Sequence, residues 1–119
     1  MQRNFRLTRS EDFKRVRRDG KSYAHPLVVL IALNSKNKDQ PHVRVGVAAG
    51  KSVGTAVYRN RAKRLLREAM RTLIPNIASN LDLVLIARPG LVSATLDDTQ
   101  RALQNLLQRA KILTPKHES

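Results

Sequence analysis

Residues 51–71 read K-S-V-G-T-A-V-Y-R-N-R-A-K-R-L-L-R-E-A-M-R, and the rest of the chain is organised around them. From Ala56 onward, a helical step of about 100° per residue places two kinds of side chain on opposite sides. The apolar side consists of Ala62, Leu65, Leu66, Ala69, Met70 and Leu73. The polar side consists of Asn60, Arg61, Lys63, Arg64, Arg67 and Arg71. The stretch therefore predicts a helix that packs by one face and presents dense positive charge on the other.

The residues that flank this helix predict where it begins and ends. Gly54 permits a sharp entry, and Thr55 is a suitable N-cap residue. Pro75 is expected to stop the helix, because the residue before a proline is pushed out of the helical region.

The charge of the polar side is almost uncompensated, since Glu68 is the only acidic residue among the six arginines and lysines of residues 59–71. Acids one turn apart would neutralise such a face by i,i+4 pairing, but here like charges stand close together and repel. One interpretation is an ordinary solvated helix face. The interpretation that the charge density favours is binding of phosphates, which guanidinium groups grip with two hydrogen bonds. The amide of Asn60 suits a base edge or a 2′-hydroxyl.

The composition supports a basic, polyanion-binding protein. The chain has 119 residues, with 23 Lys and Arg, nine acids and a formal net charge of +14, which indicates a nucleic acid or an anionic membrane surface as partner. No apolar run has the length of a membrane span and no signal-peptide core is present, so we expect a cytoplasmic protein without a membrane partner. Cysteine is absent, which excludes disulfides and thiolate metal sites. Residues 1–119 are expected to form one domain with a short flexible tail over about 113–119.

The first 21 residues predict a basic helix, since they hold eight basic and three acidic side chains. Ser10 is a suitable cap, and Gly20 is suited to end the helix. Phe13 lies on the same face of this helix as Val16. It is either a core residue or a partly exposed ring on which a base stacks.

Three apolar segments predict strands. The run over residues 27–33 should begin to pair only after Pro26, and its continuous apolar character suits a strand covered on both faces or facing a groove. Residues 43–49 alternate valine with small or polar residues, and the small ones leave room for something to approach closely. Residues 81–87 form another buried strand. The polar residues 34–42 are interpreted as a loop or a hairpin connection.

Thr95 is expected to cap a last helix that has Asp97 and Asp98 in its first turn and Pro115 beyond its end. The two acids are interpreted as helix-start residues rather than Mg²⁺ ligands. The three histidines, His25, His42 and His117, lack metal-binding spacing. The string K-S-V-G-T lacks the first half of a P-loop. We therefore expect no autonomous active site and no metal site.

The string V-G-T-A-V-Y-R-N-R-A-K-R-L-L-R-E at residues 53–68 closely resembles the signature of the bacterial ribonuclease P protein family, whose hallmark is R-N-R followed by K-R and R-E. The resemblance runs from L-T-R-S-E-D-F at residues 7–13 to the final helix. It implies a single α+β sandwich in the order α-β-β-β-α-β-α. It also implies a left-handed β-α-β crossover around the R-N-R helix, against the general right-handed rule.

The resemblance also implies a function. In the family a large RNA subunit, using bound Mg²⁺, removes the 5′ leader of precursor tRNA, and the protein binds no cofactor of its own. The protein binds ribonuclease P RNA through the R-N-R helix and holds the leader in a groove between the first helix and the sheet. Carried over by position, the RNA-binding residues are Lys51, Arg59, Asn60, Arg61, Lys63, Arg64, Arg67 and Arg71. The leader-binding residues are Arg9, Phe13, Arg17 and Ile31.

Three positions depart from the family's pattern. Arg17 stands where a second aromatic residue is common, Ile31 where a strand aromatic is common, and Ser52 where a lysine is common. The guanidinium of Arg17 can replace a ring by stacking on a base or by pairing with a leader phosphate. A structural RNA-binding protein, such as a small ribosomal protein, fits the size and charge equally well, but the R-N-R string and the apolar strand groove argue against it. A DNA-binding module is a weaker third alternative.

Overall fold

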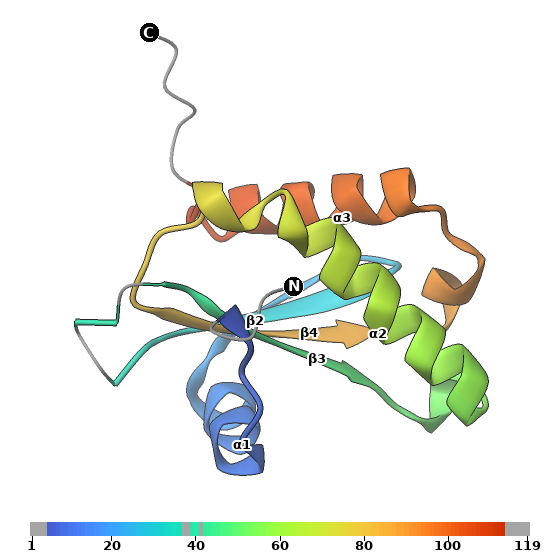
Figure 1. Ribbon diagram of the computed structural model, residues 1–119, viewed down its shortest axis with the longest axis horizontal. Coiled ribbons are helices and arrows are strands. Elements are labelled where there is room, and N and C mark those ends of the chain that lie inside the picture. Colours follow the sequence, from blue (N-terminus) through green and yellow to red (C-terminus); the bar gives the residue numbers. More distant parts are fainter. Residues whose placement is uncertain (1–4, 37–38, 41, 114–119) are drawn as a thin grey trace, which may run out of the picture.

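The computed structural model describes residues 5–36, 39–40 and 42–113, and these form one four-stranded sheet between one helix and two helices (Figure 1). The elements follow the order α1 (Ser10–Asp19), β1 (Lys21–Ala24), β2 (Val28–Asn34), β3 (Arg44–Ala49), α2 (Ala56–Arg71), β4 (Leu81–Ala87) and α3 (Leu96–Arg109). The predicted α+β class and the order α-β-β-β-α-β-α are confirmed.

The strand order in the sheet is β1-β2-β4-β3. The β1, β2 and β4 strands pair antiparallel, whereas β3 pairs parallel with β4, so α2 is the crossover helix between these two neighbours. This arrangement makes β3 an edge strand. The left-handedness of the crossover stays a prediction from the family resemblance.

Helices α2 and α3 cover one face of the sheet and enclose the main core (Figure 1). The predicted apolar side of α2 is confirmed, with Leu65 and Leu73 at the margin of the core and the other four side chains buried. Each fully buried leucine or methionine contributes about 1.5–3 kcal/mol. The largest of these in the core are Leu30, Leu66, Met70, Leu83, Leu85, Leu91, Leu103, Leu106 and Leu107.

Among the described helices, α1 covers the opposite face of the sheet. Val16 of α1 packs with Leu7, Ile31 and Val84 in a smaller apolar cluster. Because alternate residues of β2 point to the two faces, Leu30 joins the main core and Ile31 joins this second cluster. Both faces of β2 therefore meet apolar side chains, but the face beneath α1 is only partly covered, because Val29 and Leu33 are half-buried.

A buried carboxylate ties α1 to the sheet. Asp82 of β4 is fully buried and accepts hydrogen bonds from Arg15 of α1 and from Arg44 of β3, the latter at 3.0 and 3.1 Å. Burial alone would raise the pKa of Asp82, but the hydrogen bonds from Arg44 and Arg15 outweigh it and hold that pKa below its ordinary value. Asp12 adds a second contact to Arg15 at 3.4 Å.

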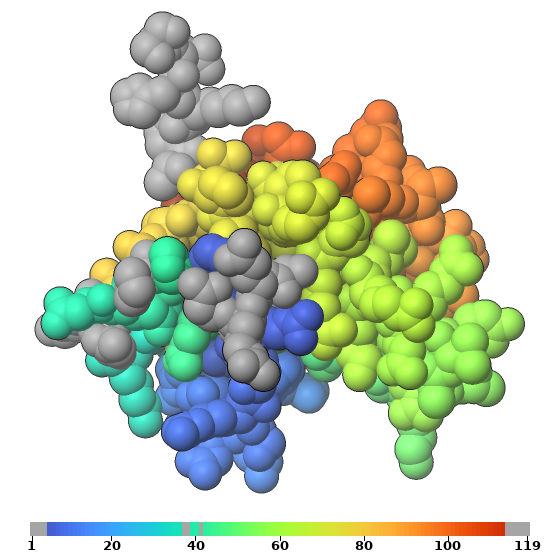
Figure 2. Space-filling model, in the orientation of Figure 1, coloured from blue at the N-terminus to red at the C-terminus, as the bar shows by residue number. Residues whose placement is uncertain are grey.

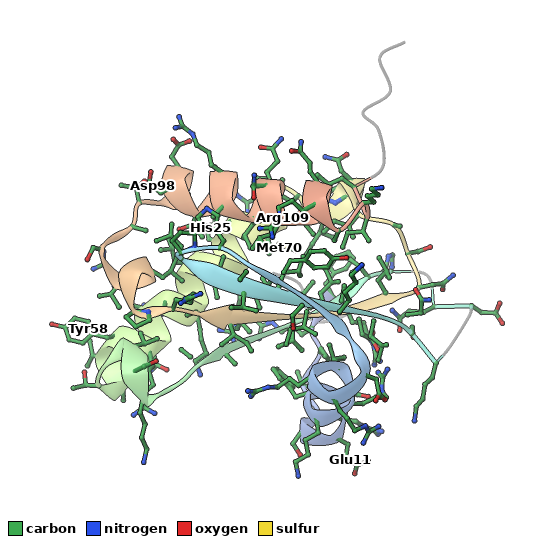
Figure 3. All side chains as sticks on the ribbon, turned by 180° about the vertical axis from the view of Figure 1, so that it is seen from behind. Glu11, His25, Tyr58, Met70, Asp98 and Arg109 are labelled. Atoms are coloured by element: carbon green, nitrogen blue, oxygen red, sulfur yellow. The ribbon has the colours of Figure 1, made fainter. Side chains whose placement is uncertain are left out.

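The strand predicted over residues 27–33 does begin after Pro26, since β2 starts at Val28. A further strand that the residues did not indicate precedes it, since β1 forms a hairpin with β2 in which Ser22 lies opposite Ile31. As an edge strand, β1 needs few apolar residues, which is why its polar sequence gave no signal. Of the two alternatives for residues 34–42, a loop or a hairpin connection, the hairpin is excluded, because β4 inserts between β2 and β3. Seen from behind, α3 lies over the β1–β2 hairpin, and Arg109 donates a hydrogen bond to the carbonyl of Ala24 at 2.7 Å (Figure 3).

The helix ends differ from the sequence predictions at Ser10 and at the end of α2, whereas Thr55 has its predicted position. Ser10 is the first residue of α1 and not its cap, a position that Arg9 occupies. Thr55 is at the N-cap of α2 but makes no side-chain capping hydrogen bond. The helix also stops before the predicted boundary, and Pro75 lies in a separate 3₁₀ turn, Ile74–Asn76.

The start of α3 agrees with its prediction, because Thr95 and Asp98 form a reciprocal capping box. The tail predicted over residues 113–119 lies outside the described residues except for Leu113, which bridges to Ile77. None of the described helices is both long enough and apolar enough to cross a membrane.

We predict that Leu66→Ala lowers the free energy of unfolding by about 2–5 kcal/mol, because it removes buried methyl groups and leaves a cavity between α2 and the sheet. Urea denaturation measures the change. Val57→Ala is the matched control on the same helix, since Val57 is 73% exposed and should change stability by less than about 0.5 kcal/mol. A loss of RNA affinity without a loss of stability in Leu66→Ala would contradict the observed orientation of α2.

We predict that Asp82→Asn costs about 3–5 kcal/mol at neutral pH, because the buried guanidinium of Arg15 loses its main counter-charge and keeps only the 3.4 Å contact with Asp12. The folded-state pKa of Asp82 lies below its ordinary value of 3.8, so the stabilisation is present above that value and is lost as the pH falls through the folded-state pKa. The difference between wild type and variant should therefore narrow in acid. Asp97→Asn, in an exposed pair with Arg101, is the control, and an equal effect of both variants would refute the argument.

Candidate nucleic-acid interface

The basic residues of α2 form two rows along the helix. Arg59, Lys63 and Arg67 follow one another at i, i+4 and i+8 and are half-buried. The outer row is exposed and consists of Asn60, Arg61, Arg64 and Arg71. The predicted RNA-binding residues of α2 are thus brought together on one surface, while Lys51 stands apart and exposed in a 3₁₀ turn, Lys51–Val53, that precedes the helix.

Little of this charge is neutralised within the molecule. Glu68 pairs with Arg71 at 2.9 Å, and the hydrogen bond from Arg71 lowers the pKa of Glu68. Within the part of the chain that the structure describes, none of the other cations of α2 takes part in an ion pair. Arg59 also has a buried Nε–H group without a hydrogen-bond partner. An unsatisfied buried donor is costly, so the inner row has unused capacity to bind an acceptor.

The beginning of α2 adds to the positive character of this surface. Its first turn has no acid, and the uncapped amides of a helix N-terminus carry partial positive charge. Gly54 has a φ of 132°, and the ring of Tyr58 lies over it, 3.0 Å from where a Cβ would stand. Val57 and Tyr58 are 73% and 48% exposed, which places apolar surface beside the basic rows.

Phe13 lies on the other side of β3, on the face that α1 covers. A Cβ at Gly46 would lie 2.4 Å from the ring's Cζ and 2.9 Å from both Cε atoms, so the tip of the ring rests on this glycine. The small residues of β3 were predicted to admit a close approach, and at Gly46 the approaching group is a side chain of the same chain. Because Phe13 is half-buried, it is neither wholly a core residue nor fully exposed.

The remaining predicted leader-binding residues differ in accessibility. Arg9 and Arg17 are exposed, and Arg17 follows Phe13 by one helical turn, on the same flank of α1. Ile31 is only 5% exposed, since it packs beneath α1 in the second cluster. Along the same sheet face, Val29 and Ile86 are only half-buried, and the sequence reasoning did not single them out. No sequence signal distinguishes them, because β2 and β4 are apolar at nearly every position.

A cavity of about 210 Å³ lies between these two surfaces, and no sequence pattern predicted it. It is lined by Arg6, Leu7, Thr8, Phe13, Val45, Val47 and Arg67. Burial, and to a lesser extent the charge of Arg6, lower the pKa of Arg67. The cavity therefore joins the N-terminal segment, α1 and α2 at the edge of β3.

The candidate metal-binding and catalytic residues are dispersed. Among the described residues, no group of three or more His, Asp and Glu side chains is arranged to hold a metal ion. The Nδ1 atom of His25 accepts a hydrogen bond from the backbone of Leu27, and His42 packs edge-on against Phe5. His117 lies outside the described residues. Asp98 has the structural role predicted for it, in the capping box of α3.

The fold and these surfaces define a small, strongly basic α+β protein that presents a polyanion-binding helix beside a partly open apolar sheet face. Comparison with known proteins specifies the family. A family model described as Ribonuclease P matches residues 1–111. The ribonuclease P protein components of Exiguobacterium sp. and Brevibacillus brevis are 41% and 40% identical over 112 and 113 residues, which are 94% and 95% of this chain and 95% and 88% of those proteins.

Solved structures of RNase P proteins support the same family assignment. The RNase P protein of Staphylococcus aureus superposes with a TM-score of 0.80 at 32% identity, covering 92% of this chain and 98% of that one. The RNase P protein from Thermotoga maritima gives 0.75 at 29% identity, covering 87% and 98%. The chain therefore belongs to the ribonuclease P protein component family. Its role is in tRNA processing, as the protein part of a ribonucleoprotein, and this assignment decides against a ribosomal or DNA-binding protein.

We predict that Arg64→Ala and Arg67→Ala each reduce the slope of log affinity against log salt for a bacterial ribonuclease P RNA by about 0.7–0.9, which is the contribution of one phosphate contact. Binding titrations at several salt concentrations measure the slope. Arg101→Ala, which removes an exposed arginine from α3, is the charge-matched control and should leave the slope unchanged. Unchanged slopes in both α2 variants would exclude these contacts.

Proposed function

We propose that this chain binds the ribonuclease P RNA through the basic rows of α2 and the 5′ leader of precursor tRNA through α1 and the open part of the sheet. The observation that carries the proposal is that most cations of α2 form no ion pair with the described residues. Repulsion among them disfavours the free protein and disappears when phosphates bind, so the charge arrangement favours the complex. These cations are Arg59, Arg61, Lys63, Arg64 and Arg67. The predicted contributions of Asn60 and Arg71 belong to the same surface, and that of Lys51 belongs to the turn that precedes the helix.

The leader contact rests on the neighbouring surface. Phe13 offers a partly accessible ring, and Arg9 and Arg17 on the same helix offer cations for phosphates, a combination that holds single-stranded RNA without reading its sequence. The burial of Ile31 favours Val29 and Ile86 as the apolar side chains that a base meets, with Ile31 supporting them from beneath α1. A leader held in this way adds affinity for precursor tRNA that mature tRNA lacks.

Cleavage itself belongs, in this proposal, to the RNA subunit with its bound Mg²⁺, and the protein supplies neither a catalytic group nor a metal site. The protein acts through binding energy and charge. Its net charge of +14 offsets the repulsion between two RNA molecules, so it lowers the concentration of Mg²⁺ that their association requires. The expectation of a cytoplasmic location belongs to this proposal as well.

Reconstitution tests the proposal. Precursor tRNA and a bacterial ribonuclease P RNA are incubated at low Mg²⁺ with and without this protein, and removal of the leader is followed. We expect cleavage to rise when the protein is present and the protein alone to be inactive on precursor tRNA. A solved mutant of the Staphylococcus aureus RNase P protein is described as defective in mRNA degradation activity, so the experiment includes a sample of the protein alone with an unstructured RNA. Cleavage of precursor tRNA by the protein alone would overturn the proposal that the RNA subunit carries out the cleavage.

We predict that Phe13→Ala weakens the affinity of the holoenzyme for precursor tRNA with several leader nucleotides by roughly 5- to 150-fold, the equivalent of one lost base stack of about 1–3 kcal/mol. Affinity for mature tRNA and assembly with the RNA subunit should hardly change. Tyr23→Ala is the aromatic control, because Tyr23 packs against the main core on the opposite face of the sheet. Equal losses for precursor and mature tRNA would show that Phe13 acts only as a core residue.

A further inference from the structure

The N-terminal segment is attached to the free edge of the sheet. The backbone N–H of Leu7 donates to the carbonyl of Val45 at 3.0 Å, and Arg6 forms an isolated parallel bridge with the same strand residue. The side chains of Arg6 and Thr8 are exposed on either side of the buried Leu7. The pairing therefore holds two polar side chains beside β3, close to where the chain enters α1.

These side chains meet α2 across a cavity. The cavity of about 210 Å³ has an apolar base of Leu7, Val45 and Val47, and the remaining lining residues are Arg6, Thr8, Phe13 and Arg67. In Figure 2 the blue atoms of the N-terminal segment border the yellow-green atoms of α2. The lining thus combines two guanidinium groups, one hydroxyl and one aromatic ring, contributed by three separate parts of the chain.

The described residues that line the cavity include two arginines and no acid to neutralise them. Arg6 lowers the pKa of Arg67 by repulsion, in addition to the effect of burial. No acid is among the described residues that line the cavity, and neither arginine takes part in an ion pair of the described part of the chain. An anion between the two guanidinium groups would replace their repulsion by charge-assisted hydrogen bonds.

We propose that this cavity is a subsite for one backbone phosphate of the 5′ leader, which Arg6 and Arg67 bind together while the adjacent base lies against Phe13. The inference rests on the proposed leader contact of Phe13 and adds Arg6 as a residue that determines how the leader is held. The guanidinium of Arg67 has five N–H donors, so it binds this phosphate in addition to the RNA-subunit phosphate proposed for it above. The leader is favoured over the RNA subunit as the source of the phosphate because the ring that stacks a leader base lines the same cavity. Thr8 supplies a further hydroxyl donor to the phosphate.

The first test measures leader-dependent affinity of the reconstituted holoenzyme. Precursor tRNAs whose leaders lengthen by one nucleotide at a time are compared with mature tRNA for wild type and for Arg6→Ala. We expect Arg6→Ala to reduce precursor affinity by about tenfold once the leader reaches the subsite, and to leave mature tRNA unchanged. The salt dependence of that affinity should become shallower by about 0.7, the value for one phosphate of a single strand.

The second test identifies the phosphate. Each leader phosphate is replaced in turn by an uncharged methylphosphonate, and wild type is compared with Arg6→Ala in a double-mutant cycle. At one position the replacement should abolish the effect of Arg6→Ala, because the two changes remove the same interaction. At the other positions the two effects should add. Arg6→Lys, which keeps the charge but loses the planar fork, should retain part of the affinity.

Control variants distinguish the loss of a phosphate contact at Arg6 from a loss of protein stability and from a loss of the leader contact at Phe13. Arg101→Ala removes an equal charge from α3, and urea unfolding checks that Arg6→Ala keeps the stability of the wild type. The inference is overturned if Arg6→Ala leaves leader-dependent affinity unchanged, or if it weakens assembly with the RNA subunit instead. If Phe13→Ala abolishes leader dependence and Arg6→Ala does not, the proposed function stands and the subsite falls. If leader length does not affect the wild type, the proposed leader contact itself fails.

Discussion

The attachment of α1 to the sheet depends on one buried carboxylate. Asp82 lies on β4, and its two guanidinium partners come from α1 and from the edge strand β3, so a single side chain fixes three elements relative to one another. Replacing a buried ion pair by apolar residues often leaves stability unchanged, and hydrogen bonds have a direction that apolar contacts lack. We therefore attribute to Asp82 chiefly the position of α1, and with it the placement of the Phe13 ring on Gly46.

The two sides of helix α2 have opposite effects on the stability of the free protein. Its inner side chains, such as Leu66 and Met70, are fully buried and hold it on the sheet, whereas the cations of its other side repel one another. A helix optimised for stability alone would alternate acids and bases on that side. The local conflict is typical of a functional surface, where a binding partner and not the fold supplies the compensating charge. The rigid core beneath the cations keeps their spacing fixed.

Much of the architecture was predictable because its signals are local. The 3.6-residue period of α2, the apolar runs of β2 and β4 and the capping box at Thr95 each depend on residues close together in the sequence. The features that the residues did not indicate depend on weak or non-local signals. The edge strand β1 has no apolar pattern, and the insertion of β4 between β2 and β3 depends on the packing of the whole sheet. The early end of α2 reflects the turn that Pro75 enters.

The sequence by itself determined the family, the basic face of α2 and the chemical type of its ligand, because charge and helical period are properties of neighbouring residues. Only the tertiary structure decided which side chains meet across the molecule. The contact of Phe13 with Gly46, the burial of Ile31 against Val16 of α1 and the convergence of Arg6 with Arg67 join residues that are 15 to 61 positions apart. Such contacts follow from how helices pack on a sheet, and no pattern along the chain encodes them.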